Sequence, residues 1–270
     1  MGIEEPIKIV SRDNQRLVRI RKIRAAKLPD YILIEGKRLV EEAIRNRIDV
    51  EEVYFSEAFA AGRPEVLDAI GSSAYLLSEK LFASISDTKT PQGIIAISKR
   101  PPSLLELDRL FDPNDGSELV LLLENVRDPA NVGSVLRVAK AAGVAAVLMT
   151  ENSADPFSAK ALRASMGAAF GIRICSNLAF EDVIKAAKPK GYRVAAATGT
   201  GNIGFWDVDW CAPTLLMLGS EGDGLSRTAL NEADITVTIP MQNNVESLNL
   251  AVSCGVIVYE AFRQKQTAKA

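Results

Sequence analysis

Hydrophobic and polar positions divide the chain into two regions, and both alternate short strands with helical segments. Between residues 31 and 98, β-rich runs at 31–36, 50–56, 74–78 and 93–98 alternate with segments of helical spacing at 37–47, 64–71 and 79–87. From residue 119 onward the predicted strands are almost wholly apolar, at 119–124, 145–150, 192–198, 214–219 and 235–240. Strands without polar alternation are buried on both faces, as in a mostly parallel sheet covered by helices. The pattern therefore predicts an α/β protein.

A stretch rich in turn-forming residues, KRPPSLLELDRLFDPNDGSE at 99–118, separates the two regions. The chain has 270 residues, which exceeds the usual size of one domain, so a division is expected. We predict a basic helical arm at 1–30, a small α/β domain at 31–100, a linker at 101–118 and a second α/β domain at 119–270.

The predicted arm carries most of the positive charge of the chain. Residues 8–27 contain eight Lys or Arg and one acidic residue, although the net charge of the whole chain is −2. Apolar residues recur at helical spacing within the arm, which indicates a helix with one docked edge. Its cationic face has two interpretations of equal weight, phosphate binding or pairing with acidic residues. The candidate RNA-binding residues are Arg16, Arg19, Arg21 and Arg24 of the arm, and the Lys37–Arg38 pair that follows it.

Composition excludes several classes of function. Hydrophobic residues make up 47% of the chain, but no apolar run approaches the length of a membrane span, and the first residues lack a secretory signal, so we expect a cytoplasmic protein without a membrane partner. The three cysteines have no metal-binding spacing, and we expect no metal. Histidine is absent, which excludes a Ser-His-Asp triad and a Cys-His pair.

Gly199, Gly201 and Gly204 have the spacing of a dinucleotide-binding loop. Such a loop requires a helix to begin at the third glycine, but FWDVDWCAP follows and shows no helical period. The context favours a glycine-rich turn and disfavours a nicotinamide-dependent oxidoreductase. A turn of this kind can still line a ligand pocket at the carboxyl end of a sheet.

Three other stretches each lie at the C-terminal end of a predicted strand. They are NVRDPANVGSVLRVAKAAGV at 125–144, LLMLGSEGDGLS at 215–226 and IPMQNNVESLNLAVSCGVIVYEAFRQ at 239–264. In order, spacing and residue type they resemble the three signature motifs of the SpoU-TrmH family of RNA ribose 2′-O-methyltransferases, within the SPOUT superfamily. The departure is MQNN, where relatives often carry a glycine. The region from YILIEGKRLVEEAI to TPQGIIAIS resembles the substrate-binding domain of the family more loosely.

The resemblance implies a SPOUT domain with a deep trefoil knot, preceded by a small α/β RNA-binding domain. It also implies a homodimer and the cofactor S-adenosylmethionine (SAM). The residues that it assigns to the cofactor are Thr198, Gly199, Leu218, Gly219, Glu221, Ile239, Met241, Ser247, Leu248 and Asn249.

The catalytic candidates are Asn131, Arg137, Glu221, Ser247 and Asn249. Asn131, Ser134 and Arg137 recur every third residue, so we expect them on one helix face, with Arg137 a lone cation among apolar residues. A buried cation needs an anion, either a substrate phosphate or Glu221. Because guanidinium stays protonated, we assign Arg137 to electrostatic stabilisation. The proton acceptor is left open between Glu221, a phosphate oxygen and water. Taken singly, Asn131 and Glu221 could also be ordinary helix caps.

These features predict SAM-dependent 2′-O-methylation of a ribose in structured RNA. The additional amino-terminal domain favours ribosomal RNA, and transfer RNA is the alternative substrate. A non-catalytic RNA-binding or assembly protein that retains the fold is the alternative from another class.

Overall fold

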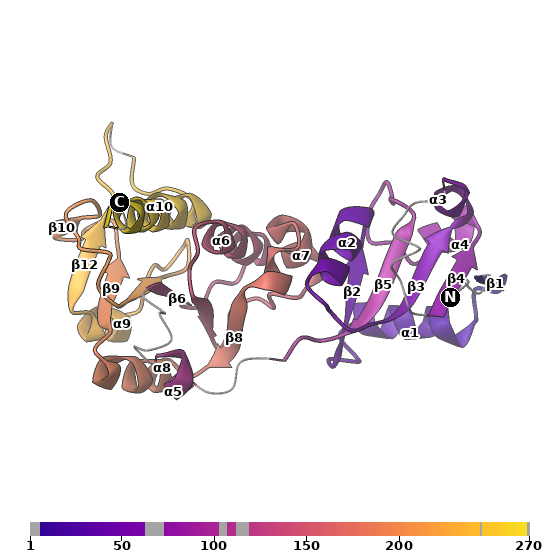
Figure 1. Cartoon of the computed structure of the whole chain (residues 1–270), viewed down its shortest axis with the longest axis horizontal. Helices are drawn as coiled ribbons and strands as arrows, with labels where there is room; N and C mark the ends of the chain where they lie inside the picture. The colour runs from indigo at the N-terminus through magenta and orange to yellow at the C-terminus, as the bar shows by residue number, and fades with distance from the viewer. Residues whose placement is uncertain (1–5, 63–72, 103–106, 112–118, 244, 269–270) are drawn as a thin grey trace. The chain divides into compact units, whose positions relative to one another are not determined.

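The computed structural model describes residues 6–62, 73–102, 107–111, 119–243 and 245–268 (Figure 1). It contains two compact units. The amino-terminal unit comprises the described residues up to 102 together with 157–170, and the carboxyl-terminal unit comprises those from 107 to 156 and from 171 onward. Among the described residues, no helix has the length and apolar character needed to cross a membrane.

The amino-terminal unit is built on a mixed five-stranded sheet with the order β1-β4-β3-β5-β2. Neighbouring strands β1, β4 and β3 are parallel, whereas β5 is antiparallel to both β3 and β2. The predicted helix at 64–71 lies outside the described residues. The strands are β1 (Ile7–Ile9), β2 (Tyr31–Glu35), β3 (Val50–Ser56), β4 (Ser73–Leu77) and β5 (Ile94–Lys99), and the helices are α1 (Gln15–Arg24), α2 (Lys37–Arg45), α3 (Glu57–Ala61), α4 (Glu79–Ala83), α7 (Ala159–Ser165) and the 3₁₀ helix η3 (Ala168–Gly171).

Helix α1 shares its core with this sheet. Leu17, Ile20 and Ile23 are buried in one cluster with Tyr54 and Tyr75 of the sheet strands. The apolar spacing therefore predicted the docked edge of the helix correctly. The segment that contains α7 also packs on this unit, since a Cβ on Gly167 would lie 2.7 Å from the Cβ of Glu42.

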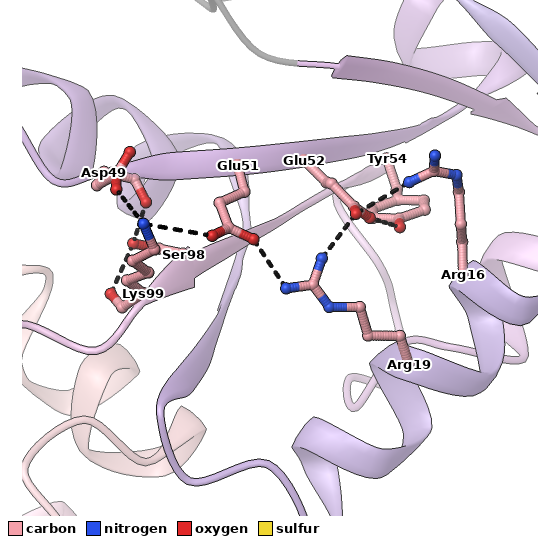
Figure 2. Close-up of polar contacts among 8 residues, drawn as sticks. All are labelled: Arg16, Arg19, Asp49, Glu51, Glu52, Tyr54, Ser98 and Lys99. Carbon is pink, nitrogen blue, oxygen red and sulfur yellow. Dashed lines mark hydrogen bonds and ion pairs between the residues drawn. The ribbon is translucent and has the colours of Figure 1, made fainter.

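A network of charged side chains fastens α1 to β3 (Figure 2). Glu52 is only 8% exposed and accepts hydrogen bonds from Arg16 at 2.9 Å and Arg19 at 2.7 Å. Arg19 also donates to Glu51 at 2.8 Å. Burial raises the pKa of the Tyr54 phenol, and its hydrogen bond to Glu52 adds to this shift. Burying a carboxylate without partners costs free energy, so the burial of Glu52 depends on Arg16 and Arg19.

The carboxyl-terminal unit is built on a seven-stranded sheet in which all neighbours are parallel, with the order β10-β12-β9-β11-β6-β7-β8. Helices α6 and α10 cover one face, and α5, α8 and α9 cover the other (Figure 1). The strands are β6 (Leu119–Leu123), β7 (Ala146–Thr150), β8 (Arg173–Leu178), β9 (Arg193–Ala197), β10 (Ile203–Gly204), β11 (Thr214–Leu218) and β12 (Ile235–Thr238), and the helices are α5 (Leu107–Leu110), α6 (Pro129–Ala141), α8 (Phe180–Ala187), the 3₁₀ helix η4 (Lys188–Lys190), α9 (Arg227–Glu232) and α10 (Leu250–Ala268).

All five apolar strands predicted from residue 119 onward are present, and their burial explains their composition. Leu121, Leu216 and the rest of β6 and β11 are fully or almost fully buried. The glycine-rich stretch after β9 forms a turn and the two-residue strand β10, without a helix at 199–213. The interpretation of this stretch as a turn is therefore confirmed. Because the strands are parallel, the loops after β6, β9, β11 and β12 all leave the same edge of the sheet.

Candidate active site

A cavity of about 330 Å³ lies at the carboxyl edge of the parallel sheet. Its lining comes from the turn after β9, the loop after β11, Leu230 of α9, the loop after β12 and the first turns of α10. Nine of the ten residues assigned to the cofactor from sequence line this cavity, and Asn249 is the exception. The nine are Thr198, Gly199, Leu218, Gly219, Glu221, Ile239, Met241, Ser247 and Leu248.

The loop after β11 is closed on itself. Ser220 N donates to Gly224 O at 3.2 Å, and Gly224 N donates to Ser220 O at 3.0 Å. A Cβ on Gly219 would lie 2.1 Å from the carbonyl carbon of Gly224, a distance that no side chain tolerates. Glycine at position 219 therefore lets the two ends of the loop meet and projects Glu221 from its tip.

The side chain of Asn249 connects the three sequence motifs. Its Nδ2 donates to Asn131 Oδ1 at 3.1 Å and to Glu221 Oε1 at 2.8 Å. Its Oδ1 accepts from Ala251 N at 3.0 Å and from Val252 N at 3.4 Å, which caps the start of α10. One amide thus fixes a helix end and joins α6, the loop after β11 and α10.

The capping roles that were open for Asn131 and Glu221 belong to other residues. Asp128 caps α6 by accepting from Ala130 N, and Ser226 caps α9 by accepting from Ala229 N. Asn131 is buried and Glu221 is exposed beside the cavity. Their contacts with Asn249 are therefore the interactions that position both side chains.

Arg137 does not lie where the spacing predicted. Its side chain is exposed, so the expectation of a buried cation is wrong for the single chain. Within the described part of the chain, Arg137 pairs with no acidic group, and Glu221 contacts Asn249 instead. The reason is helical geometry, because each step of three residues rotates a side chain by about 60° around the axis. Asn131 and Arg137 are two such steps apart and face different directions.

The arginines of α1 engage groups of their own unit. Arg16 and Arg19 bind Glu52, Arg21 Nε donates to Leu17 O at 3.1 Å, and Arg24 donates to Ile85 O. This arrangement favours the acid-paired interpretation of the helix over phosphate binding. Lys37 and Arg38 are exposed and line an open hollow beside α2, where Lys37 lies 3.7 Å from Glu41.

Two kinds of residue at the site escaped the sequence reasoning. Asp223 and Glu246 line the cavity together with Glu221, and all ionisable residues among the lining residues are acidic. Glu124 is 5% exposed at the end of β6. Its place as the acidic last residue of the otherwise apolar predicted strand 119–124 was the sequence signal that could have indicated Glu124. The cavity therefore combines apolar walls and glycine backbone with negative charge, which suits a flat ligand that carries a cationic group. In the described ranges, no three potential metal ligands come together.

Comparisons with known proteins agree with this geometry. The SpoU rRNA Methylase family matches residues 118–259, and the MRM3-like substrate binding domain matches residues 15–96. The chain is 32% identical to the 23S rRNA (guanosine(2553)-2′-O)-methyltransferase RlmP of Bacillus subtilis, over 93% of this chain and 97% of that protein. It is 30% identical to the uncharacterized tRNA/rRNA methyltransferase slr1673 of Synechocystis, over 94% of this chain and 92% of that protein.

Solved structures show the same likeness. The AdoMet-bound rRNA methyltransferase from Sinorhizobium meliloti superposes with a TM-score of 0.83 at 28% identity, covering 96% of this chain and 98% of that one. A structure described as an RNA 2′-O ribose methyltransferase superposes with a TM-score of 0.78 at 29% identity, covering 96% of this chain and all of the other.

The bridge made by Asn249 leads to a stability prediction. Asn249→Ala loses the cap of α10 and both donated bonds, so we expect a loss of about 1–2 kcal/mol or more in the free energy of unfolding. Asn249→Asp keeps the cap but places two carboxylates together. Adding Glu221→Gln restores a donor opposite the new acceptor, so the double variant should be more stable than Asn249→Asp alone.

Urea unfolding followed by circular dichroism measures these differences. Gln242→Ala is the matched control, because Gln242 is exposed in the preceding loop. A stability of Asn249→Ala equal to that of the control would show that the bridge contributes nothing.

Proposed function

This chain belongs to the SpoU rRNA methylase family, and on that premise we propose that it transfers a methyl group from SAM to the 2′-hydroxyl of a ribose in ribosomal RNA. The observation that carries the proposal is that the second and third motifs line one cavity, and that Asn249 joins the first motif to them through Asn131. Arg137, Glu221, Ser247 and Asn249 are all present, which argues against a non-catalytic protein that retains only the fold.

The cavity suits SAM in shape and charge. The backbone of Gly219, Ile239 and Leu248 would hold the adenosine, with Leu218 and Met241 against its apolar faces. SAM carries a sulfonium and an ammonium against one carboxylate, so its net charge is positive. The acidic lining of the cavity therefore favours its binding.

Methyl transfer requires alignment and the removal of one proton. SAM supplies the methyl carbon, and the protein supplies geometry and electrostatics. As the ribose oxygen forms its bond to the methyl carbon, the carbon–sulfur bond breaks and the hydroxyl proton leaves. Of the three acceptors considered, Glu221 is the one that the protein orients, because Asn249 binds its Oε1 and the carboxylate is exposed beside the cavity.

We assign Arg137 to a phosphate of the RNA. Its exposure on α6 leaves the guanidinium accessible to a large substrate, for which a planar bidentate donor is well suited. Since guanidinium stays protonated, its contribution is electrostatic rather than that of a base.

Ribosomal RNA is the proposed substrate because the relative in Bacillus subtilis is named for 23S rRNA and the amino-terminal unit matches a substrate-binding domain. We propose that this unit holds the RNA, with exposed Arg38 among its contacts, while the carboxyl-terminal unit performs the transfer. A cytoplasmic location with ribosomal RNA follows from this substrate. A structure concerned with the 2-OH methylation of C/U34 on tRNA covers only 55% of this chain, and the name of the Synechocystis relative includes both tRNA and rRNA, so transfer RNA is the less favoured substrate.

We propose that the carboxyl-terminal segment is knotted. A Cβ on Gly199 would lie 3.5 Å from the backbone oxygen of Glu246, so the segment before α10 runs against the turn after β9. Such crossing is what a knot would require, and the SpoU family supplies the precedent.

We also propose a homodimer formed through α10. Val252, Tyr259 and Phe262 are 50%, 49% and 38% exposed on this helix. Positions separated by seven and three residues share one face of a helix, so together they form an apolar surface. A second copy of the chain would cover it.

The cofactor assignment is tested by two neighbouring glycines. Gly219→Ala forces a Cβ against Gly224, whereas a Cβ on Gly222 would have no atom within 4 Å. We expect Gly219→Ala to weaken SAM binding by about 5- to 100-fold, and Gly222→Ala to bind like the wild type. Calorimetry with SAM, and transfer of labelled methyl to ribosomal RNA, measure the effect. Failure of the wild type to methylate ribosomal RNA would overturn the proposed function, and equal SAM affinity of the two variants would overturn only the loop assignment.

The electrostatic role of Arg137 predicts that Arg137→Ala keeps SAM affinity and loses about 100- to 1000-fold in single-turnover rate. Arg137→Lys keeps the charge without the planar fork and should restore the rate only partly. Lys140→Ala, which removes a cation from the last turn of the same helix, is the control. If lysine at 137 reached the wild-type rate at alkaline pH, a base would be the better assignment.

The dimer proposal predicts that Phe262→Glu is a monomer, with half the molar mass of the wild type in solution. The reason is that the substitution would bury one charge from each copy in the interface. Val10→Glu changes an apolar residue that is 78% exposed in the amino-terminal unit, and it should leave the mass unchanged. Sedimentation velocity of the three proteins at one concentration decides the question, and a monomeric wild type would refute the dimer.

A further inference from the structure

Glu124 holds both ends of the loop that follows β11. Its backbone N–H donates to Leu218 O at 2.9 Å, at the point where β11 ends and the loop begins. Its carboxylate Oε2 accepts from Ser226 N at 2.8 Å, where the loop ends and α9 begins. A single residue at the end of β6 therefore binds the chain on either side of 219–225.

The loop held in this way forms one wall of the cavity. Six of its seven residues line the cavity, all but Gly222. Inside the loop, the paired hydrogen bonds between Ser220 and Gly224 fix its shape, and Glu221 at its tip contacts Asn249. The position of the whole wall therefore depends on how the two ends are anchored to the sheet.

The anchor at Ser226 is a charged group in a buried place. Glu124 is 5% exposed, and burying a carboxylate is costly unless it is hydrogen-bonded. The Ser226 hydroxyl accepts from Ala229 N at 3.0 Å, so the side chain of Ser226 is occupied in capping α9 while its own N–H turns to Glu124. A charged acceptor makes a stronger hydrogen bond to this N–H than a neutral one would. Burial of the Glu124 carboxylate costs free energy, and its bond to Ser226 N is strong. Both features indicate that the position of the loop 219–225 is held accurately.

We propose that Glu124 is a positioning residue for the cofactor site, which presets the loop 219–225 in its SAM-binding form. This inference rests on the proposed function. Glu124 does not line the cavity, and so it acts through Gly219 and Glu221 rather than on the cofactor itself. When fewer molecules hold the binding form, the apparent Kd for SAM rises by the same factor, while molecules saturated with SAM react normally.

Three substitutions separate this role from a general contribution to stability. Glu124→Gln keeps an acceptor at the same reach and should bind SAM within about 3-fold of the wild type. Glu124→Asp keeps the charge but is one methylene too short for Ser226 N, and Glu124→Leu removes the acceptor. For both we expect the Kd and KM for SAM to rise about 10-fold, with kcat at saturating SAM retained within about 3-fold.

Thr150→Val is the matched control. Thr150 is 6% exposed at the end of β7, and its Oγ1 accepts from Asn125 N at 3.0 Å. The substitution therefore removes a buried bond between a side-chain oxygen and a backbone N–H at the same sheet edge, and neither Thr150 nor Asn125 belongs to the loop after β11. We expect a lower unfolding temperature with unchanged SAM affinity.

Calorimetry with SAM is carried out well below the unfolding temperature of every variant, and methyl transfer to ribosomal RNA is followed over a range of SAM concentrations. A Kd for SAM in Glu124→Asp and Glu124→Leu equal to that in Thr150→Val would overturn the positioning role. A fall in kcat at constant KM in these two variants would overturn it as well. Should Glu124→Leu fail to fold, the comparison of the Kd for SAM in Glu124→Asp with that in Glu124→Gln tests the positioning role alone. Absence of SAM binding by the wild type would instead refute the proposed function.

Discussion

The hydrogen bonds of Asn249 are the constraint on which the rest of the site depends. Its amide contacts Asn131, 118 residues away in sequence, and Glu221, 28 residues away, while its oxygen caps α10. An amide can satisfy these partners only in one orientation, since both acceptors must face Nδ2 and the helix amides must face Oδ1. The start of α10, the first turn of α6 and the tip of the loop after β11 are thereby held in one arrangement. Replacement by a residue with a single polar function would leave one of these elements without its anchor.

Parallel strands make that arrangement possible. The loops that follow β6, β9, β11 and β12 leave one edge of the sheet, so residues that are far apart in sequence meet without long connections. Glycine then sets how closely the backbones approach. At Gly201 an added Cβ would lie 2.5 Å from the carbonyl carbon of Val237, and Gly219 is similarly crowded by Gly224. Gly201, the middle glycine of the spacing that imitates a dinucleotide-binding loop, is thus explained by contact between neighbouring backbones.

The sequence predicted those parts of the molecule that depend on local pattern. Apolar runs indicated the buried parallel strands, and the spacing of Leu17, Ile20 and Ile23 indicated the docked edge of α1. Partners across the fold were beyond its reach. Nothing in the sequence near Arg19 indicates that Glu51 and Glu52 would bind it. The apolar residues around α7 indicate that this helix is buried, but they do not indicate which unit it packs on. The prediction that Arg137 is buried was wrong for a different reason. Residues spaced three apart turn progressively around a helix, so they do not define one face.

The pairing and exposure of the basic side chains determine how a chain with a net negative charge can bind RNA. The +7 charge of residues 8–27 overstates the positive surface, because Glu52 and Glu51 pair with Arg16 and Arg19. Phosphate contacts contribute affinity in proportion to the cations that remain accessible. Other exposed cations, among them Arg38, Lys89 and Arg137, are numerous but spread over both units. Because these cations are spread out on a chain whose net charge is −2, they favour a folded RNA whose shape meets several separate contacts together. A structured ribosomal substrate satisfies that condition, and a flexible single strand does not.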